Sequence, residues 1–64
     1  MEEEEFEELI MYKKEHTIEE FALRLREYFI KNYDNKEKLA RFMHKFPNET
    51  EEVVNYFKKT GKEF

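Results

Sequence analysis

The sequence predicts an all-α protein, a compact bundle of four short helices that forms a single domain over residues 1–64. Apolar side chains recur at the i, i+3, i+4, i+7 spacing that marks one face of a helix. The single proline and the single glycine, Pro47 and Gly61, stand at the ends of such segments rather than inside them. Sustained apolar–polar alternation and Asn-Gly or Asp-Gly pairs are absent from the sequence, so strands and hairpins have no support.

The first helix is expected over residues 3–15, where Phe6, Leu9 and Ile10 form an apolar stripe that Lys13 continues. Glutamates at its start suit the positive end of the helix dipole, and two lysines near its end suit the negative one.

The second helix is expected to open at Thr17, because Thr17 and Glu20 have the spacing of a capping box, and to end near Asn32. Further apolar residues lie off its main stripe, so we expect this helix to be central and to be contacted on more than one side. The main stripe consists of Ile18, Phe21, Ala22, Leu25 and Phe29.

Asp34 and Glu37 repeat the capping spacing and predict a short third helix, which Pro47 ends. Its apolar stripe is Leu39, Phe42, Met43 and Phe46.

A fourth helix is expected to be capped either by Asn48 with Glu51 or by Thr50 alone. Gly61 is a natural left-handed stop at its end. Its apolar residues are Val53, Val54, Tyr56 and Phe57.

Several of these segments also match a known pattern. They are Phe6 with Leu9 and Ile10, the run 18–22, the step Phe29-Ile30-Lys31, and the spacing of Leu39, Phe42 and Met43. In this order the chain resembles the YozE-like family of small bacterial proteins. The resemblance covers most of the chain, but the family's usual Phe-Pro-Lys step and its aspartate-rich approach are missing. It implies a sterile-alpha-motif-like fold, and no catalytic residues, because the family has no settled activity.

The sequence contains few of the residues that enzymes use for nucleophilic or metal-assisted catalysis. There is no cysteine and no serine, and Thr17, Thr50 and Thr60 stand where helices begin or end, which predicts capping rather than nucleophilic catalysis. His16 and His44 belong to different expected helices and have no recognisable metal-ligand spacing. We therefore expect no catalytic residue, no metal, no cofactor and no small-molecule substrate.

Charge is distributed unevenly along the chain. Residues 1–22 carry nine acidic and two basic side chains, whereas residues 23–46 carry three acidic and seven basic ones. These segments predict either head-to-tail pairing between two molecules or attraction between the two segments within one molecule.

Two surfaces are candidate binding sites. The first is apolar, because four residues lie outside the neatest core stripes and form an exposed patch unless they close the bundle: Met11, Tyr12, Leu23 and Ile30. The second is basic, with Tyr28 and Tyr33 nearby as stacking groups for nucleic-acid bases. It consists of Arg24, Lys31, Lys38, Arg41 and Lys45.

These observations predict a non-enzymatic protein-interaction or regulatory module that binds a protein partner or itself. A nucleic-acid-associated domain that uses the basic segment is the alternative, and a designed or purely structural domain is a third hypothesis. The glutamates after Met1 are the reverse of a secretory signal, and no apolar run is long enough for a membrane span. The expected location is cytoplasmic.

Overall fold

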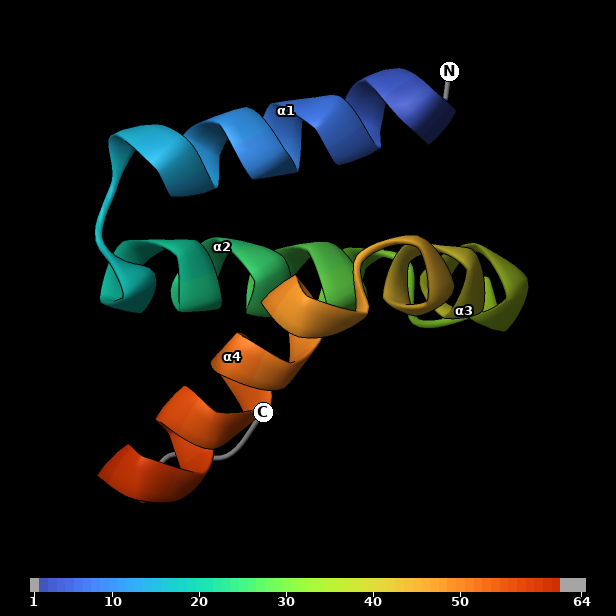
Figure 1. The fold of residues 1–64 in the computed structure, drawn as a ribbon. Helices are drawn as coiled ribbons and strands as arrows, with labels where there is room; N and C mark the ends of the chain where they lie inside the picture. The colour runs from blue at the N-terminus through green and yellow to red at the C-terminus, as the bar shows by residue number, and fades with distance from the viewer. Residues whose placement is uncertain (1, 62–64) are drawn as a thin grey trace.

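The four predicted helices are present in the computed structural model, which describes residues 2–61 and, for residue 2, the backbone alone. α1 and α2 lie side by side and antiparallel, α4 crosses α2 obliquely, and α3 lies beyond the C-terminal end of α2 (Figure 1). The all-α, four-helix prediction is therefore confirmed. The helices are α1 (Glu2–Glu15), α2 (Ile18–Lys31), α3 (Lys36–Lys45) and α4 (Pro47–Thr60).

The predicted start of α2 is confirmed atom by atom. The backbone N–H of Thr17 donates to Oε1 of Glu20 over 3.2 Å, and the backbone N–H of Glu20 donates to Oγ1 of Thr17 over 3.3 Å. This reciprocal capping box satisfies two amides that would otherwise lack a partner at the helix start. The predicted stop after α4 is also confirmed, because Gly61 has a left-handed backbone with a φ of 73°.

The predicted cap of α3 is wrong by one residue. The side chain of Asn35, not that of Asp34, accepts a hydrogen bond from the backbone of Lys38 over 3.2 Å. The reason is a turn after α2, closed by a hydrogen bond from the Asn35 N–H to the carbonyl of Asn32 over 2.9 Å, which uses Asp34 as a turn residue. The helix consequently begins at Lys36.

The predicted caps of α4 are also wrong. The helix begins at Pro47, and Phe46 alone separates it from α3, with no side-chain cap. Proline suits the first helical position because its ring fixes φ and its missing N–H would have no intrahelical acceptor there. Thr50 bonds backward instead, its hydroxyl donating to the carbonyl of Phe46 over 2.9 Å.

One hydrophobic core joins all four helices, and α2 is central to it, since it packs against both α1 and α4. This confirms the expected central position of α2. Burial of these side chains is the main favourable contribution to folding in a chain that has no disulfide bond. The buried residues are Phe6, Leu9, Phe21, Ala22, Leu25, Phe42, Val53 and Phe57.

Two apolar residues of the predicted stripes are exposed. Ile18 is 41% exposed and Met43 is 40% exposed. Ile18 is the first residue of α2 and follows directly on its N-cap, Thr17. Met43 lies on α3, whose neighbours bury the adjacent Phe42 completely and leave this flank of the helix open.

Candidate functional site

Three of the four residues of the predicted apolar patch are exposed. Met11, Leu23 and Ile30 are 54%, 40% and 61% exposed; the first lies on α1 and the other two on α2. Met11 lies on the side of α1 opposite the buried Phe6 and Leu9, among residues of α1 alone. Leu23 and Ile30 are seven residues apart on α2 and therefore share a stripe that faces away from the core.

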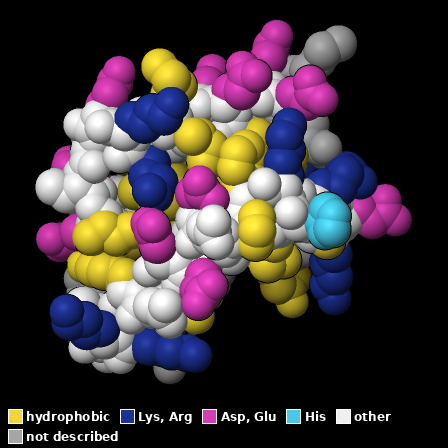
Figure 2. Space-filling view, viewed as in Figure 1, with side chains coloured by type: hydrophobic (Ala, Val, Ile, Leu, Met, Phe, Trp, Pro, Cys, Tyr) yellow, Lys and Arg dark blue, Asp and Glu magenta, His cyan; other side chains and the backbone are white. Residues whose placement is uncertain are grey.

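The surroundings of Met11 are strongly acidic. A shallow hollow beside it is lined by α1 residues, most of them glutamates: Glu4, Glu7, Glu8, Met11, Tyr12 and Glu15. Figure 2 shows the corresponding row of acidic side chains along the edge of the molecule that α1 forms. An apolar side chain ringed by carboxylates on a helix surface is well hydrated, so Met11 is a weak candidate for an apolar contact.

The fourth member of that prediction, Tyr12, is half-buried and engaged with its neighbours. Its ring stacks on the imidazole of His16 with centroids 3.7 Å apart, and the guanidinium carbon of Arg24 lies 5.3 Å from the ring centroid. The Nδ1 atom of His16 is 2.9 Å from the carbonyl oxygen of Tyr12. Tyr12 thus belongs with Arg24, at the junction of α1 and α2, and not with Leu23 or Ile30.

The predicted basic patch is divided by the fold. Arg24 and Lys31 line a hollow between α1 and α2, whereas Arg41 and Lys45 line a more open surface with Glu3, Phe6, Ala40 and His44. Lys38 lies between these two sets and forms an ion pair with Glu5 of α1. The five cations are therefore distributed over two hollows and the ion pair of Lys38 with Glu5.

Lys38 is held by groups from α1, α2 and the turn that follows. Besides its ion pair with Glu5, its Nζ donates to Oδ1 of Asn32 over 3.3 Å and lies 5.5 Å from the centroid of the Tyr28 ring. The hydrogen bond to Glu5 raises the pKa of Lys38 above its usual value, against a lowering by burial, and Tyr28 raises this pKa further. The acidic first helix and the basic third helix therefore attract each other within one molecule.

We expect this arrangement to make stability depend on alkaline pH. Because the pKa of Lys38 is higher in the folded than in the unfolded state, its contribution is complete below a lysine's ordinary pKa of about 10.4. That contribution is lost as the pH rises through the higher pKa of the folded state. Urea unfolding of the wild type and of Lys38→Arg should show the arginine variant gaining relative stability as the pH rises. Lys36→Arg, at an exposed position of the same helix, is the matched control. If the free energy of unfolding of both variants differed from that of the wild type by an amount that did not change with pH, the prediction would be contradicted.

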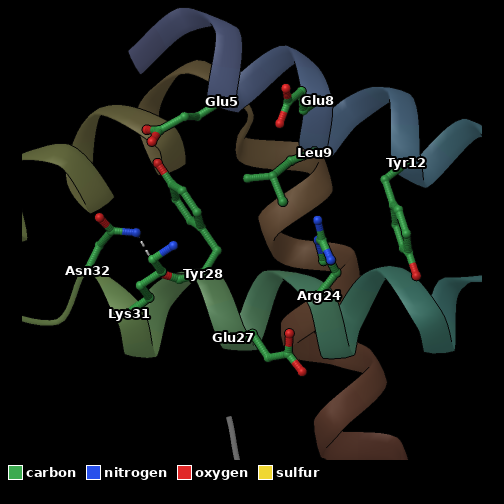
Figure 3. Close-up of a pocket in the computed structure, with 9 residues that line it drawn as sticks. All are labelled: Glu5, Glu8, Leu9, Tyr12, Arg24, Glu27, Tyr28, Lys31 and Asn32. Carbon is green, nitrogen blue, oxygen red and sulfur yellow. Dashed lines mark hydrogen bonds between the residues drawn. The ribbon is translucent and has the colours of Figure 1, made fainter. Parts of the chain in front are cut away.

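A further candidate site is the hollow between α1 and α2, which we call the α1–α2 groove. Its volume is about 340 Å³. In Figure 3, Arg24 points from α2 toward α1 between Leu9 and Tyr12, and Glu8 approaches from α1 on the opposite side. The lining residues are Glu5, Glu8, Leu9, Tyr12, Arg24, Glu27, Tyr28, Lys31 and Asn32.

Four charges in the α1–α2 groove have no ionic partner in the described part of the chain. Arg24 and Lys31 are on α2 with Glu27 between them, and Glu8 is on α1; none of the four forms an ion pair there. Glu5 is different, because it is paired with Lys38. A groove that holds charges of both signs without satisfying them internally suits a ligand that carries the complementary charges.

The sequence contained one signal for this groove that the prediction of a basic patch did not use. Arg24, Glu27 and Lys31 have i, i+3, i+7 spacing, so they share one stripe of α2 beside the core stripe. The glutamates opposite them could not be assigned, because that requires knowing which face of α1 meets α2.

No group of three or more histidine, aspartate or glutamate side chains that could hold a metal ion occurs among the described residues. Within the same part of the chain, none of the helices has the length and apolar character needed to cross a bilayer.

No protein-family model, curated protein sequence or solved structure matches this chain. The resemblance to the YozE-like family and its sterile-alpha-motif-like fold stays a prediction. Function must consequently be inferred from the surface of the molecule itself.

Proposed function

We propose that this chain is a small, non-enzymatic protein-interaction module and that it binds its partner in the α1–α2 groove. The observation that carries the proposal is the set of unpaired charges of both signs around a partly apolar floor, at Arg24, Lys31, Glu8 and Glu27. Protein interfaces combine apolar and aromatic contacts with complementary polar groups in this way.

The floor of the groove supports the same conclusion. Tyr12 and Tyr28 are half-buried, so their rings are partly available to a partner, whereas Leu9 between them is buried and belongs to the core. Tyrosine and arginine are enriched where proteins bind one another, because each offers apolar area together with hydrogen-bonding groups. Arg24 lies over Tyr12 and places both kinds of group at one point of the groove.

Nucleic-acid binding is less well supported by this geometry. A phosphate backbone is attracted by adjacent cations along a track. Here Lys38 is paired with Glu5, and Arg24 and Lys31 face a groove that also contains Glu8 and Glu27. Carboxylates beside the cations repel phosphates, so the groove favours a partner with charges of both signs.

A site-specific photo-crosslinker tests the proposal. A benzophenone amino acid replaces Glu27 at the rim of the groove, and the same probe replaces the exposed Asn55 of α4 in a control protein. In extracts of the source cells, the probe at position 27 should yield a protein adduct of discrete mass that excess wild-type chain suppresses. The control should yield no such adduct. A nuclease-sensitive adduct, or identical products from both positions, would refute binding of a protein in the groove.

A further inference from the structure

Building on the proposed function, we infer that the α1–α2 groove binds an α-helical segment of a partner protein with one acidic edge and one basic edge. The inference specifies the chemistry of the partner at the proposed site. It follows from the different charges of the two walls, from the apolar and aromatic floor between them, and from the peptide groups of both walls, which are already hydrogen-bonded within their own helices.

The two walls differ in their unpaired charges, which are two cations and Glu27 on α2 and Glu8 on α1. On the α2 wall, Arg24 and Lys31 are seven residues apart, which is two helical turns or about 10 Å. On the α1 wall, Glu8 is unpaired in the described chain, whereas Glu5 is paired with Lys38. An occupant therefore meets a mainly basic wall on one side and an acidic wall on the other, and its two edges should be charged in the opposite sense.

The spacing on the α2 wall matches a helix in the occupant. Acidic side chains at i and i+7 of a helix lie on one edge at the same separation of about 10 Å as Arg24 and Lys31. Glu27, which lies between the two cations, can form an ion pair with a basic side chain at position i+3 or i+4 on the same edge of the bound helix. A basic side chain on the far edge of the occupant faces Glu8.

The size and the lining of the groove floor limit which side chains a bound helix can insert. A hollow of about 340 Å³ holds several side chains but not a helix, whose diameter with side chains is about 10–12 Å. The occupant therefore lies over the groove and inserts side chains toward Leu9, Tyr12 and Tyr28. Because these groups are apolar or aromatic, the inserted side chains should be aliphatic.

The backbone in both walls explains why the occupant should be helical. α1 and α2 satisfy their central amides and carbonyls within each helix, so the groove presents no open strand edge. An extended segment would lay its own peptide groups against these walls without receiving backbone hydrogen bonds. A helix satisfies its peptide groups internally and meets the walls with side chains alone.

A second copy of this chain does not supply the required edges through α1. The exposed face of α1 carries Glu4, Glu7, Glu8 and Glu15 around Met11, so it is acidic on both sides of its apolar residue. Such a face would meet the acidic α1 wall of another molecule with repulsion. Docking of a second copy through α1 is therefore disfavoured, and the inference commits to a different protein as the partner.

Synthetic helices test the inference. The first probe is a 15-residue alanine-based peptide, about four helical turns long at about 3.6 residues per turn. It carries two glutamates seven apart on one edge, two lysines seven apart on the other, and leucines between them. Its isomer has the same composition, but each edge carries one glutamate and one lysine. Circular dichroism verifies equal helicity, and fluorescence anisotropy at physiological salt measures binding to the full chain.

The two-edged peptide should bind roughly tenfold more tightly than the isomer, from two or three exposed charge pairs. The double variant Arg24→Glu/Lys31→Glu should abolish this preference. Lys31→Glu alone, which retains the contact between Arg24 and Tyr12, should reduce it. Lys58→Glu/Lys59→Glu, an equal change of charge on the exposed last turn of α4, should leave it unchanged.

Equal affinity for the two peptides, absence of binding by both, or loss of the preference in the α4 variant would overturn the inference. Concentration-dependent self-association that occupies the groove and excludes both peptides would overturn it as well. Each of these results would contradict the helical, two-edged partner without contradicting protein binding in the groove. A protein crosslinked at position 27 would still establish the groove as a protein-binding site, with a partner of other chemistry.

Discussion

Replacing Phe42 by alanine is expected to lower the free energy of unfolding by about 3–5 kcal/mol. The Phe42 side chain is completely buried, so the substitution removes apolar contacts and leaves a cavity. Its ring centroid also lies 5.2 Å from that of Phe6, 5.3 Å from that of Phe46, and 6.1 Å from those of Tyr28 and Phe29. One substitution therefore loosens contacts with α1, α2 and the junction before α4 together.

The expected loss is large compared with the stability of so small a domain. At the usual 0.05–0.15 kcal/mol per residue, 64 residues correspond to a total of about 3–10 kcal/mol. A large fraction of the variant should be unfolded at room temperature, as urea titration followed by far-UV circular dichroism would show.

Met43→Ala provides the comparison for Phe42→Ala. Met43 is the next residue on the same helix but is 40% exposed, so its truncation should cost no more than about 1 kcal/mol. Similar unfolding midpoints for the two variants would contradict the assignment of Phe42 to the centre of the core.

Local chemistry made part of this fold predictable. The capping box of Thr17 and Glu20 and the left-handed stop at Gly61 depend on neighbouring residues alone, and both are confirmed. The helices themselves follow from apolar spacing, which is likewise a local property. These features could be identified without knowing how the helices pack.

Packing decided the points that the sequence left open or predicted wrongly. The spacing of Phe42 and Met43 is equally consistent with burial of both, yet only Phe42 is covered by the neighbouring helices. Likewise, the start of α3 at Lys36 depends on a turn after α2, not on the capping spacing of Asp34 and Glu37. Which face of a helix is covered is a tertiary property, and a single sequence does not specify it.

The candidate site shows the same limit. Met11, Leu23 and Ile30 were correctly distinguished from the core, because they lie off its stripes. Whether Met11 of α1 forms one patch with Leu23 and Ile30 of α2 depends on the relative orientation of the two helices, so their grouping stays a prediction. Arg24 and Lys31 do share a surface, because both lie on one stripe of α2.

Charge reversal at Lys38 should measure how strongly the acidic and basic segments stabilise the folded molecule. Lys38→Glu replaces an attraction with a repulsion from Glu5, next to the half-buried Tyr28. The side chain of Lys38 is 15% exposed and that of Glu5 is 46% exposed, so solvent weakens the effect. We still expect the free energy of unfolding to fall by about 2 kcal/mol. This is more than an exposed ion pair usually contributes, because the reversal both removes an attraction and adds a repulsion.

The reverse substitution on α1 separates this charge effect from other consequences of losing the lysine. Glu5→Lys in the Lys38→Glu background restores opposite charges across the same contact and should recover most of the lost stability, as a double-mutant cycle of urea unfolding would measure. The hydrogen bond from Lys38 to Asn32 is not restored, so recovery should be incomplete. Additive effects of the two single substitutions would mean that the facing charges are not coupled. The uneven charge of the chain would then have no part in holding α1 against α3.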